Sequence, residues 1–324
     1  MPTDRYIGVD VGGGGIRVRA DLGGQLRTIK NSSPVPRARG QIDIGVLAER
    51  IGALLAPIHR GEGVHAIAVG LTGMPGLLGS PAEFAHHLHS RLPVRDVYVA
   101  SDALTTHLGA LRGHPGCVVA AGTGVIVLGT DHRQIWNQAD GWGHLLGDDG
   151  GGAWIGAQGL QAALRHHDRR DEGSAALSHQ LRQRYGDTDK ALSVIYGAGS
   201  PAHELAAFAP HVADAARQGD RVALGIWRKA GARLASATHA AARSLPPDFS
   251  WGGKLFDAEE LLHDPFKDEL ERRIPEARTH TPAGTAADGA LLLARRGLPA
   301  KGFGMEAYAA KFSPPGCTVP IAQP

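Results

Sequence analysis

The stretch YIGVDVGGGGIRVRADLGGQL, residues 6–26, places four consecutive glycines between two apolar runs. Residues 6–11 predict a strand, and residues 16–20 alternate apolar and polar side chains as a half-buried strand does. Glycine loses more conformational freedom on folding than any other residue, so such a run indicates a close approach of the backbone to something else. A β-hairpin that offers its N–H groups to a phosphate fits this run, and an ordinary glycine-rich turn is the alternative.

The composition is that of a globular chain, and its 324 residues suggest two domains. The 34 basic and 32 acidic residues nearly cancel, so nothing favours a nucleic acid or a membrane surface as partner. The polar start MPTDRY lacks the apolar core of a signal peptide, and we expect a cytoplasmic protein. Cys117 and Cys317 are too few for a disulfide framework or a four-thiolate metal site.

The second half of the chain repeats the opening pattern. Residues 116–121 predict a strand, 122–124 a tight turn and 125–129 another strand. We therefore expect an α/β protein with domains 1–112 and 113–324, in which the tail 297–324 could pack back on the first domain. Further predicted strands are 66–71 and 94–99, and predicted helices are 43–59, 81–91, 103–111, 154–185, 201–217, 220–244, 257–273 and 286–296.

Five motifs occur in a characteristic order: DVGGGG at 10–15, SDA at 101–103, AGTG at 121–124, GWGHLLGDDGGGAWIG at 141–156 and WGGKLF at 251–256. Together they resemble the N-acetylglucosamine kinase branch of the actin/sugar kinase/Hsp70-like ATPases, which sits with the BadF/BadG-type ATPases. The resemblance covers residues 6–296, and 141–156 is its most specific part. It implies two ribonuclease-H-like, actin-like ATPase domains with ATP and a sugar in an interdomain cleft. It also implies a homodimer.

Two aspartates are candidates for the chemistry of phosphoryl transfer, which needs a base, a metal and held phosphates. Asp102 follows the apolar strand 94–99 and precedes a helix. The resemblance makes it the base that takes the proton from the sugar hydroxyl, and a helix N-cap is the alternative. Asp10 would, by resemblance, hold Mg²⁺ through water, and a simple turn aspartate is the alternative.

The resemblance also carries over the binding residues. Those expected at the sugar, besides Asp102, are Asn31, Thr72, Gly73, Thr123, Gly124, Asp148 and Gly152; those expected at the nucleotide are Gly12, Gly13, Gly14, Gly122, Thr123, Gly124, Gly252 and Gly253. Gly14 and Val125 depart from the family pattern, which usually has threonine and serine there. Both departures remove hydroxyl donors, so we expect weaker nucleotide binding or a different donor preference.

The leading hypothesis is an ATP-dependent kinase of an amino sugar, acting on the 6-hydroxyl of N-acetylglucosamine. Glucosamine or another hexosamine is the nearest alternative substrate. An ATPase that activates a partner through an iron–sulfur cluster is disfavoured by the two cysteines. A sugar-responsive regulator would need a DNA-binding segment, for which residues 1–6 leave no room. The clustered histidines, such as His86, His87 and His89, are interpreted as surface residues rather than metal ligands.

Overall fold

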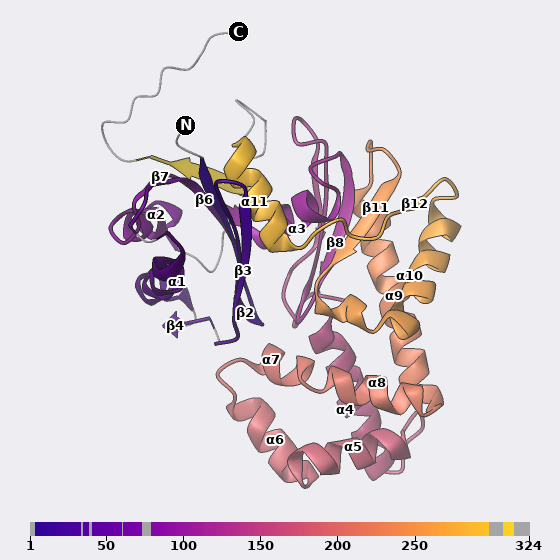
Figure 1. The fold of residues 1–324 in the computed structure, drawn as a ribbon. Coiled ribbons are helices and arrows are strands. Elements are labelled where there is room, and N and C mark those ends of the chain that lie inside the picture. The colour runs from indigo at the N-terminus through magenta and orange to yellow at the C-terminus, as the bar shows by residue number, and fades with distance from the viewer. Residues whose placement is uncertain are drawn as a thin grey trace. The chain divides into compact units, whose positions relative to one another are not determined.

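The computed structural model describes residues 4–33, 35–38, 41–59, 61–72, 79–297 and 307–313. Its contacts divide the chain into two units (Figure 1). Unit 1 holds residues up to 114, 132–134 and those from 282 onward, and unit 2 holds 115–131 and 135–281. The chain first passes from unit 1 to unit 2 after residue 114, close to the predicted boundary after residue 112. Residues 282–296 differ from the predicted second domain, because they pack with unit 1, and the described tail residues 307–313 belong to unit 1 as well.

Among the described residues, unit 1 is built on a six-stranded sheet of order β13-β7-β6-β1-β2-β3. β1, β2 and β3 form an antiparallel meander, β6 and β7 add parallel to β1, and β13 pairs antiparallel with β7. The strands are β1 (Arg5–Gly12), β2 (Gly15–Leu22), β3 (Gln25–Asn31), β6 (Val64–Leu71), β7 (Val94–Ser101) and β13 (Ala309–Phe312). A separate short hairpin joins β4 (Arg37–Ala38) to β5 (Gln41–Ile42).

Helices cover both faces of this sheet (Figure 1). α1 (Ile44–His59) and α2 (Pro81–His89) bury their apolar sides on one face. α3 (Asp102–Ala110) and α11 (Ala286–Arg296) lie on the other. α11 packs so closely on β1 that a Cβ at Gly8 would overlap the backbone of Leu291. This contact explains why α11 belongs to unit 1 although it is far from β1 in sequence.

Unit 2 has, within its described residues, a five-stranded sheet of order β10-β9-β8-β11-β12. β8, β9 and β10 form an antiparallel meander, and β11 runs parallel to β8 and to β12. The strands are β8 (Gly116–Ala121), β9 (Val125–Thr130), β10 (Trp136–Asp140), β11 (Asp248–Gly252) and β12 (Arg278–Thr279). The meander followed by a parallel strand repeats unit 1, which confirms the predicted duplication.

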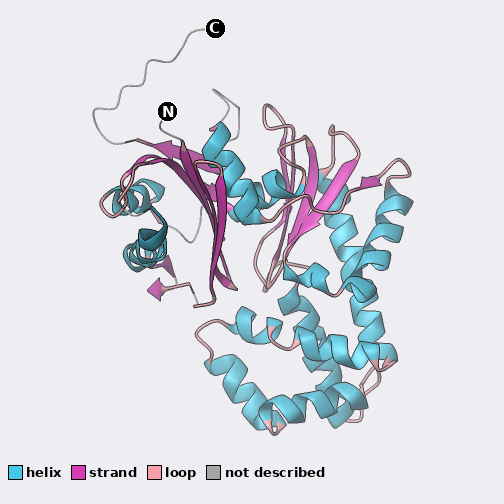
Figure 2. Ribbon diagram, in the orientation of Figure 1, coloured by secondary structure: helices cyan, strands magenta, loops and turns pink. Residues whose placement is uncertain are grey.

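The segment between β10 and β11 is helical (Figure 2). Its helices surround a core that includes Phe208, Trp227, Phe249 and Phe266. They are α4 (Gly152–His167), α5 (Ala175–Tyr185), α6 (Thr188–Gly197), α7 (Pro201–Ala206), α8 (Ala209–Arg217) and α9 (Arg221–Ala241); after β11 come the 3₁₀ turn η1 (Lys254–Asp257) and α10 (Glu259–Arg273). In the described parts of the chain, no helix is both long and apolar enough to cross a bilayer.

The predicted elements are largely confirmed, and the differences have local causes. The predicted helix 154–185 is two helices, because Arg169 and Glu172 take left-handed backbone conformations between them. The predicted loop 31–40 begins inside β3, whose last residue is Asn31. The sequence reading missed α6 and the strands β4, β5, β10, β11, β12 and β13; β4, β5, β10 and β12 are short, and β13 pairs with a strand far away in the sequence.

Candidate functional site

Three neighbouring parallel strands of unit 1 end at one edge of its sheet and carry the candidate catalytic residues there. Asp10 lies near the end of β1, Thr72 follows β6, and Asp102 follows β7. The Thr72 N–H donates to the Val11 carbonyl at 3.1 Å, which fixes the end of β6 beside β1. The carboxyl ends of parallel strands are where α/β sheets bind ligands, so this edge is the candidate site of unit 1.

Asp102 is the first residue of α3 and is not its N-cap. Ser101 is the cap, and its Oγ accepts the Leu104 N–H at 3.2 Å. The Asp102 carboxylate is therefore available for another task. Burial, together with the negative charge of Asp10, raises its pKa to about 7, although hydrogen bonds from the Thr72 hydroxyl and the Ala103 N–H act in the opposite direction. A pKa near neutrality is what a general base needs at physiological pH.

Asp10 is buried and faces a cation across the first hairpin. Arg17 stands opposite it in the β1–β2 register, and the Arg17 Nη1 donates to the Asp10 carboxylate at 3.0 Å. Burial raises the pKa of Asp10, and the contact with Arg17 partly offsets this rise. Arg17 thus stabilises the ionised carboxylate where a metal or phosphate would bind.

The four glycines of the first turn divide into two kinds. Gly15 has a positive φ of 104°, and a Cβ there would overlap the Asn31 carbonyl, so the fold itself requires this glycine. Gly12 has no atom near the position of a Cβ, and Gly13 and Gly14 are exposed at the tip. The fold gives no packing reason for a glycine at 12, which favours a ligand as the reason.

Asn31 lies beside this turn. Asn31 ends β3, which runs in the same direction as β1. Asn31 and Asp10 therefore lie at the same end of the sheet. The Asn31 Oδ1 accepts the Ser33 N–H at 2.9 Å, which orients the side chain amide. Gly73, the remaining sugar-binding candidate of unit 1, lies outside the described residues.

The second glycine turn, in unit 2, is held by the start of α4. The Gly152 N–H donates to the Gly122 carbonyl at 2.8 Å, and the Ala153 N–H donates to the Thr123 carbonyl at 2.9 Å. A Cβ on Gly152 would lie 2.8 Å from that Gly122 oxygen. The first N–H groups of α4 are therefore used to fix the turn, and the contacts of Gly152 explain it as a packing residue. Gly122 itself has open space at its Cβ position.

Asp148 stands next to this turn, in a loop whose backbone is held by another aspartate. A Cβ on Gly124 would overlap the Asp148 carboxylate, which places the two side by side. The Asp140 carboxylate accepts the N–H groups of Asp148 at 2.6 Å, Asp149 at 3.0 Å and Gly141 at 2.8 Å. Burial, and next the charge of Asp140, raises the pKa of Asp148. Asp148 is thus built into the loop, whereas the Asp149 side chain is partly exposed and its carboxylate lies 3.7 Å from Arg233.

Gly252 and Gly253 end β11 beside the same turn. Gly253 has a positive φ of 94°, and a Cβ there would overlap the Ala121 carbonyl, so the fold requires this glycine. The sequence predicted that the pair leads into a helix, whereas η1 comes first and begins at Lys254. In unit 2 the candidates at 122–124, 148, 152 and 252–253 are thus brought together around the end of β8.

The sequence reading missed three residues that shape these sites: Arg17, Ser101 and Asp140. Arg17 could have been found from the register of the two-residue hairpin, in which it must face Asp10. Asp140 could have been found from the sequence Asp-Gly-x-Gly, since aspartates commonly bind nearby backbone N–H groups in turns.

Within the described chain, no three His, Cys, Asp or Glu side chains group so that they alone could hold a metal ion. Asp10 offers the hard oxygen ligand that Mg²⁺ prefers, and Mg²⁺ commonly takes its other ligands from water and phosphate.

Two glycine substitutions separate ligand contact from folding. Gly122→Ala meets no atom, so we expect an unchanged melting temperature and a KM for ATP raised roughly 10-fold by a side chain in the phosphate path. Gly253→Ala would combine a positive φ with a backbone overlap, and should lower the free energy of unfolding by about 2 kcal/mol or more. Thermal unfolding and ATP titration of both variants check this; a destabilised Gly122→Ala with normal ATP affinity would contradict it.

Comparison with known proteins identifies the family. The model of the BadF/BadG/BcrA/BcrD ATPase family matches residues 7–294. The chain belongs to this family. It is similar to the N-acetylmuramic acid/N-acetylglucosamine kinase of Clostridium acetobutylicum, with 26% identity over 205 residues, 61% of this chain and 67% of the relative. It is also similar to the glucokinase of Thermotoga maritima, with 26% identity over 295 residues, 83% of this chain and 88% of the relative.

A solved structure supports the fold assignment. A proposed N-acetylglucosamine kinase from Chromobacterium violaceum superposes with a TM-score of 0.68 and 26% identity, over 90% of this chain and 99% of that one. Together with the two mixed sheets, this match confirms the α/β fold class of the actin-like ATPases and sugar kinases.

Proposed function

We propose that this protein transfers a phosphoryl group from ATP to a hydroxyl of an amino sugar, most simply the 6-hydroxyl of N-acetylglucosamine. The observation that supports it best is the arrangement of Asp10, Thr72 and Asp102 at three adjoining strand ends, with the pKa of Asp102 raised to about 7. The similarity to kinases named for N-acetylmuramic acid, N-acetylglucosamine and glucose supports a sugar as the acceptor.

In this proposal Asp102 accepts the proton of the sugar hydroxyl as its oxygen attacks the γ-phosphorus. The Thr72 hydroxyl orients the Asp102 carboxylate by donating to it. Asn31, Gly73, Thr123, Gly124 and Asp148 remain the proposed sugar contacts, and Gly152 supports them by fixing the turn at 122–124. The glycine turns at 12–14 and 122–124, together with Gly252 and Gly253, offer backbone N–H groups to the nucleotide.

Asp10 is the proposed carboxylate for Mg²⁺, and the contact with Arg17 favours its ionised form. Mg²⁺, when bound, would neutralise charge on the phosphates. The absence of hydroxyls at Gly14 and Val125 leaves phosphate binding to the backbone groups and to Thr123. A cytoplasmic homodimer is part of the same proposal.

Coupled ADP release over a panel of sugars tests this function. N-acetylglucosamine, N-acetylmuramic acid, glucosamine and glucose would each be added to the protein with MgATP. We expect turnover that depends on the sugar and is fastest with an N-acetylated one. ATP hydrolysis that no sugar changes would contradict a kinase and favour an ATPase or a regulator.

Glucose is the second candidate acceptor, because the glucokinase relative aligns over 83% of the chain whereas the amino-sugar kinase relative aligns over 61%. The same panel separates the two. A kcat/KM for glucose above that for every amino sugar would replace the amino sugar in the proposal and leave the role of Asp102 as it stands.

A further inference from the structure

The last described strand of the chain runs along the strand that carries Asp102. β13 pairs antiparallel with β7, with Ala309 opposite Ala100 and Phe312 opposite Val97. Beyond this ladder, the Tyr308 carbonyl accepts the Ser101 N–H at 2.7 Å. Ser101 caps α3 and directly precedes Asp102. Residues 308–313 therefore follow β7 along most of its length, up to the residue before the proposed base.

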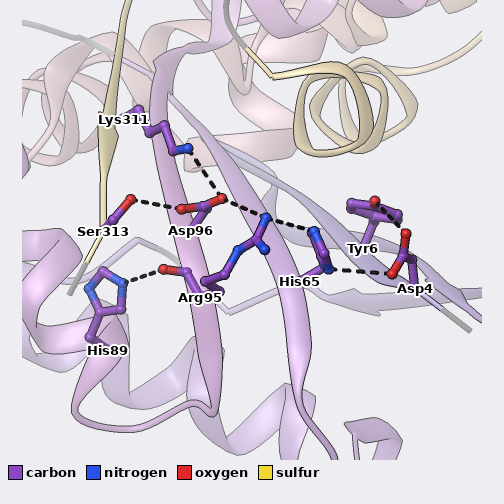
Figure 3. Close-up of polar contacts among 8 residues, drawn as sticks. All are labelled: Asp4, Tyr6, His65, His89, Arg95, Asp96, Lys311 and Ser313. Carbon is purple, nitrogen blue, oxygen red and sulfur yellow. Dashed lines mark hydrogen bonds and ion pairs between the residues drawn. The ribbon is translucent and has the colours of Figure 1, made fainter. Parts of the chain in front are cut away.

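The other end of β13 is fastened by a buried carboxylate (Figure 3). Asp96 is 3% exposed and accepts the Ser313 hydroxyl at 2.7 Å and the Lys311 Nζ at 3.2 Å. The Arg95 Nη2 lies 3.3 Å from the same carboxylate. Burial alone would raise the pKa of Asp96, but the contacts with Ser313 and Lys311 outweigh it and hold the pKa below its usual value.

From Asp96, a series of polar contacts continues through Arg95 of β7 and His65 of β6 to Asp4, which precedes β1 (Figure 3). The Arg95 Nη2 donates to the His65 Nε2 at 2.6 Å, and the His65 Nδ1 lies 3.4 Å from the Asp4 carboxylate. These residues stand at the starts of β1, β6 and β7, the sheet edge opposite to that of Asp10 and Asp102. The cluster is thus remote from the proposed chemistry, and two elements run between it and Ser101: β7, which carries Arg95, Asp96 and Ser101, and β13, which pairs with it.

We propose that residues 308–313 are a positioning element for Asp102: fastened to Asp96 at one end, they fix the Ser101 backbone through the Tyr308 carbonyl at the other. This inference rests on the proposed role of Asp102 as base. A base must be held within a fraction of an ångström of the hydroxyl it serves, and small misplacements cost large factors in rate. Asp102 begins α3, so the position of its backbone depends on how the preceding residue is held.

An edge strand with a purely structural role would behave differently from a positioning element. Loss of a structural strand lowers the free energy of unfolding, and the apparent kcat then falls only by the fraction of protein that is unfolded. Loss of a positioning strand lowers the kcat of the folded protein and leaves the KM for ATP unchanged, because residues 308–313 pair with β7 and are none of the groups proposed to hold the nucleotide. The kcat per folded protein, with the folded fraction taken from urea unfolding, therefore separates the two.

Two variants of the full chain test the proposal. Ala310→Pro introduces a residue that cannot donate to a neighbouring strand, and Ser313→Ala removes only the hydroxyl bound to Asp96. We expect kcat to fall roughly 10-fold in Ala310→Pro and about 2-fold in Ser313→Ala, with the KM for ATP within about 2-fold of wild type. Hydrogen exchange at the Ser101 amide, read by mass spectrometry, should accelerate in the same order.

Ile51→Val is the matched control, because it destabilises the core of unit 1 by about 1 kcal/mol from α1, outside the backbone pairing of β7 with β13. It should leave kcat and Ser101 exchange as in the wild type. A wild-type kcat in Ala310→Pro with accelerated exchange at Ser101 would overturn the inference, as would unchanged exchange in both variants. Absence of sugar-dependent turnover in the unaltered protein would instead overturn the proposed function.

Discussion

Asp102→Asn should reduce sugar-dependent turnover by about 10²- to 10⁴-fold, the range that general bases contribute. Asparagine has nearly the same shape and can still receive the Thr72 hydroxyl bond, so the fold of the site is retained while the proton acceptor is lost. The KM for ATP should stay near the wild-type value. Coupled ADP release with the preferred sugar measures the effect, and a variant with more than a tenth of the wild-type kcat would exclude Asp102 as the base.

The pH dependence of the wild type should report the same group. Its pKa of about 7 means that the base is protonated, and kcat/KM falls, as the pH drops below 7. Asp102→Asn should lose this acidic limb. A wild-type profile that stays flat down to pH 5 would contradict both the assigned pKa and the role of Asp102.

The same substitution should make the protein more stable at alkaline pH. The folded pKa of Asp102 lies above its unfolded value of 3.8, so the folded state binds more protons between these pH values and stability falls as the pH rises through this window. The full shift corresponds to roughly 4 kcal/mol, and because residue Asp102 is half-buried we expect about half of that. Urea unfolding at pH 5 and pH 8 checks this.

Asp149→Asn is the control for the loss of one negative charge. The Asp149 side chain is partly exposed and its carboxylate is 3.7 Å from Arg233, so the change should leave stability within about 0.5 kcal/mol at both pH values. The stability that Asp102→Asn gains over the wild type should be larger at pH 8 than at pH 5. An equal gain at both pH values would show that burial does not disfavour the charge of Asp102.

Local patterns in the sequence predict the parts of the site that are themselves local. An aspartate directly after a buried strand, as at Asp102, and a hairpin with a glycine tip, as at 12–15, are visible without a structure. Asp140 was missed because its importance comes from three N–H groups that the loop brings to it. The tail strand was missed because pairing between β13 and β7 is decided by contacts between residues about 210 positions apart, which no window of sequence contains.

The division into units also depends on contacts between residues far apart in the sequence, which local patterns do not show. Periodicity predicts α11 at its observed bounds, yet nothing in its pattern says which sheet it covers. The glycine at position 8 is the signal that was overlooked, since a glycine inside a strand often marks close approach of another backbone. In the structure that backbone is α11.

Gly289→Ala should lower the free energy of unfolding by about 3 kcal/mol or more and can prevent unit 1 from folding. A Cβ at Gly289 would overlap the Thr105 carbonyl of α3, and a Cβ at Gly109 would overlap the Thr285 carbonyl that precedes α11. At each contact between α3 and α11, a glycine of one helix lies against the backbone of the other helix or of the residue before it. A backbone carbonyl cannot rotate away from an added Cβ as a side chain could. Overpacking usually costs 1–3 kcal/mol, and a rigid backbone on the opposite side places this site at the upper end.

Gly225→Ala provides the control with the opposite sign. Gly225 also lies inside a helix, α9, but nothing stands near the position of its Cβ. Alanine is a better helix former than glycine by about 1 kcal/mol, so this variant should be more stable than the wild type. Urea unfolding of both variants measures the two free energies of unfolding.

Because α3 begins at Asp102, a folded Gly289→Ala should also lose turnover, whereas Gly225→Ala should keep it. Equal stability of the two variants would show that α3 and α11 do not pack as closely as described.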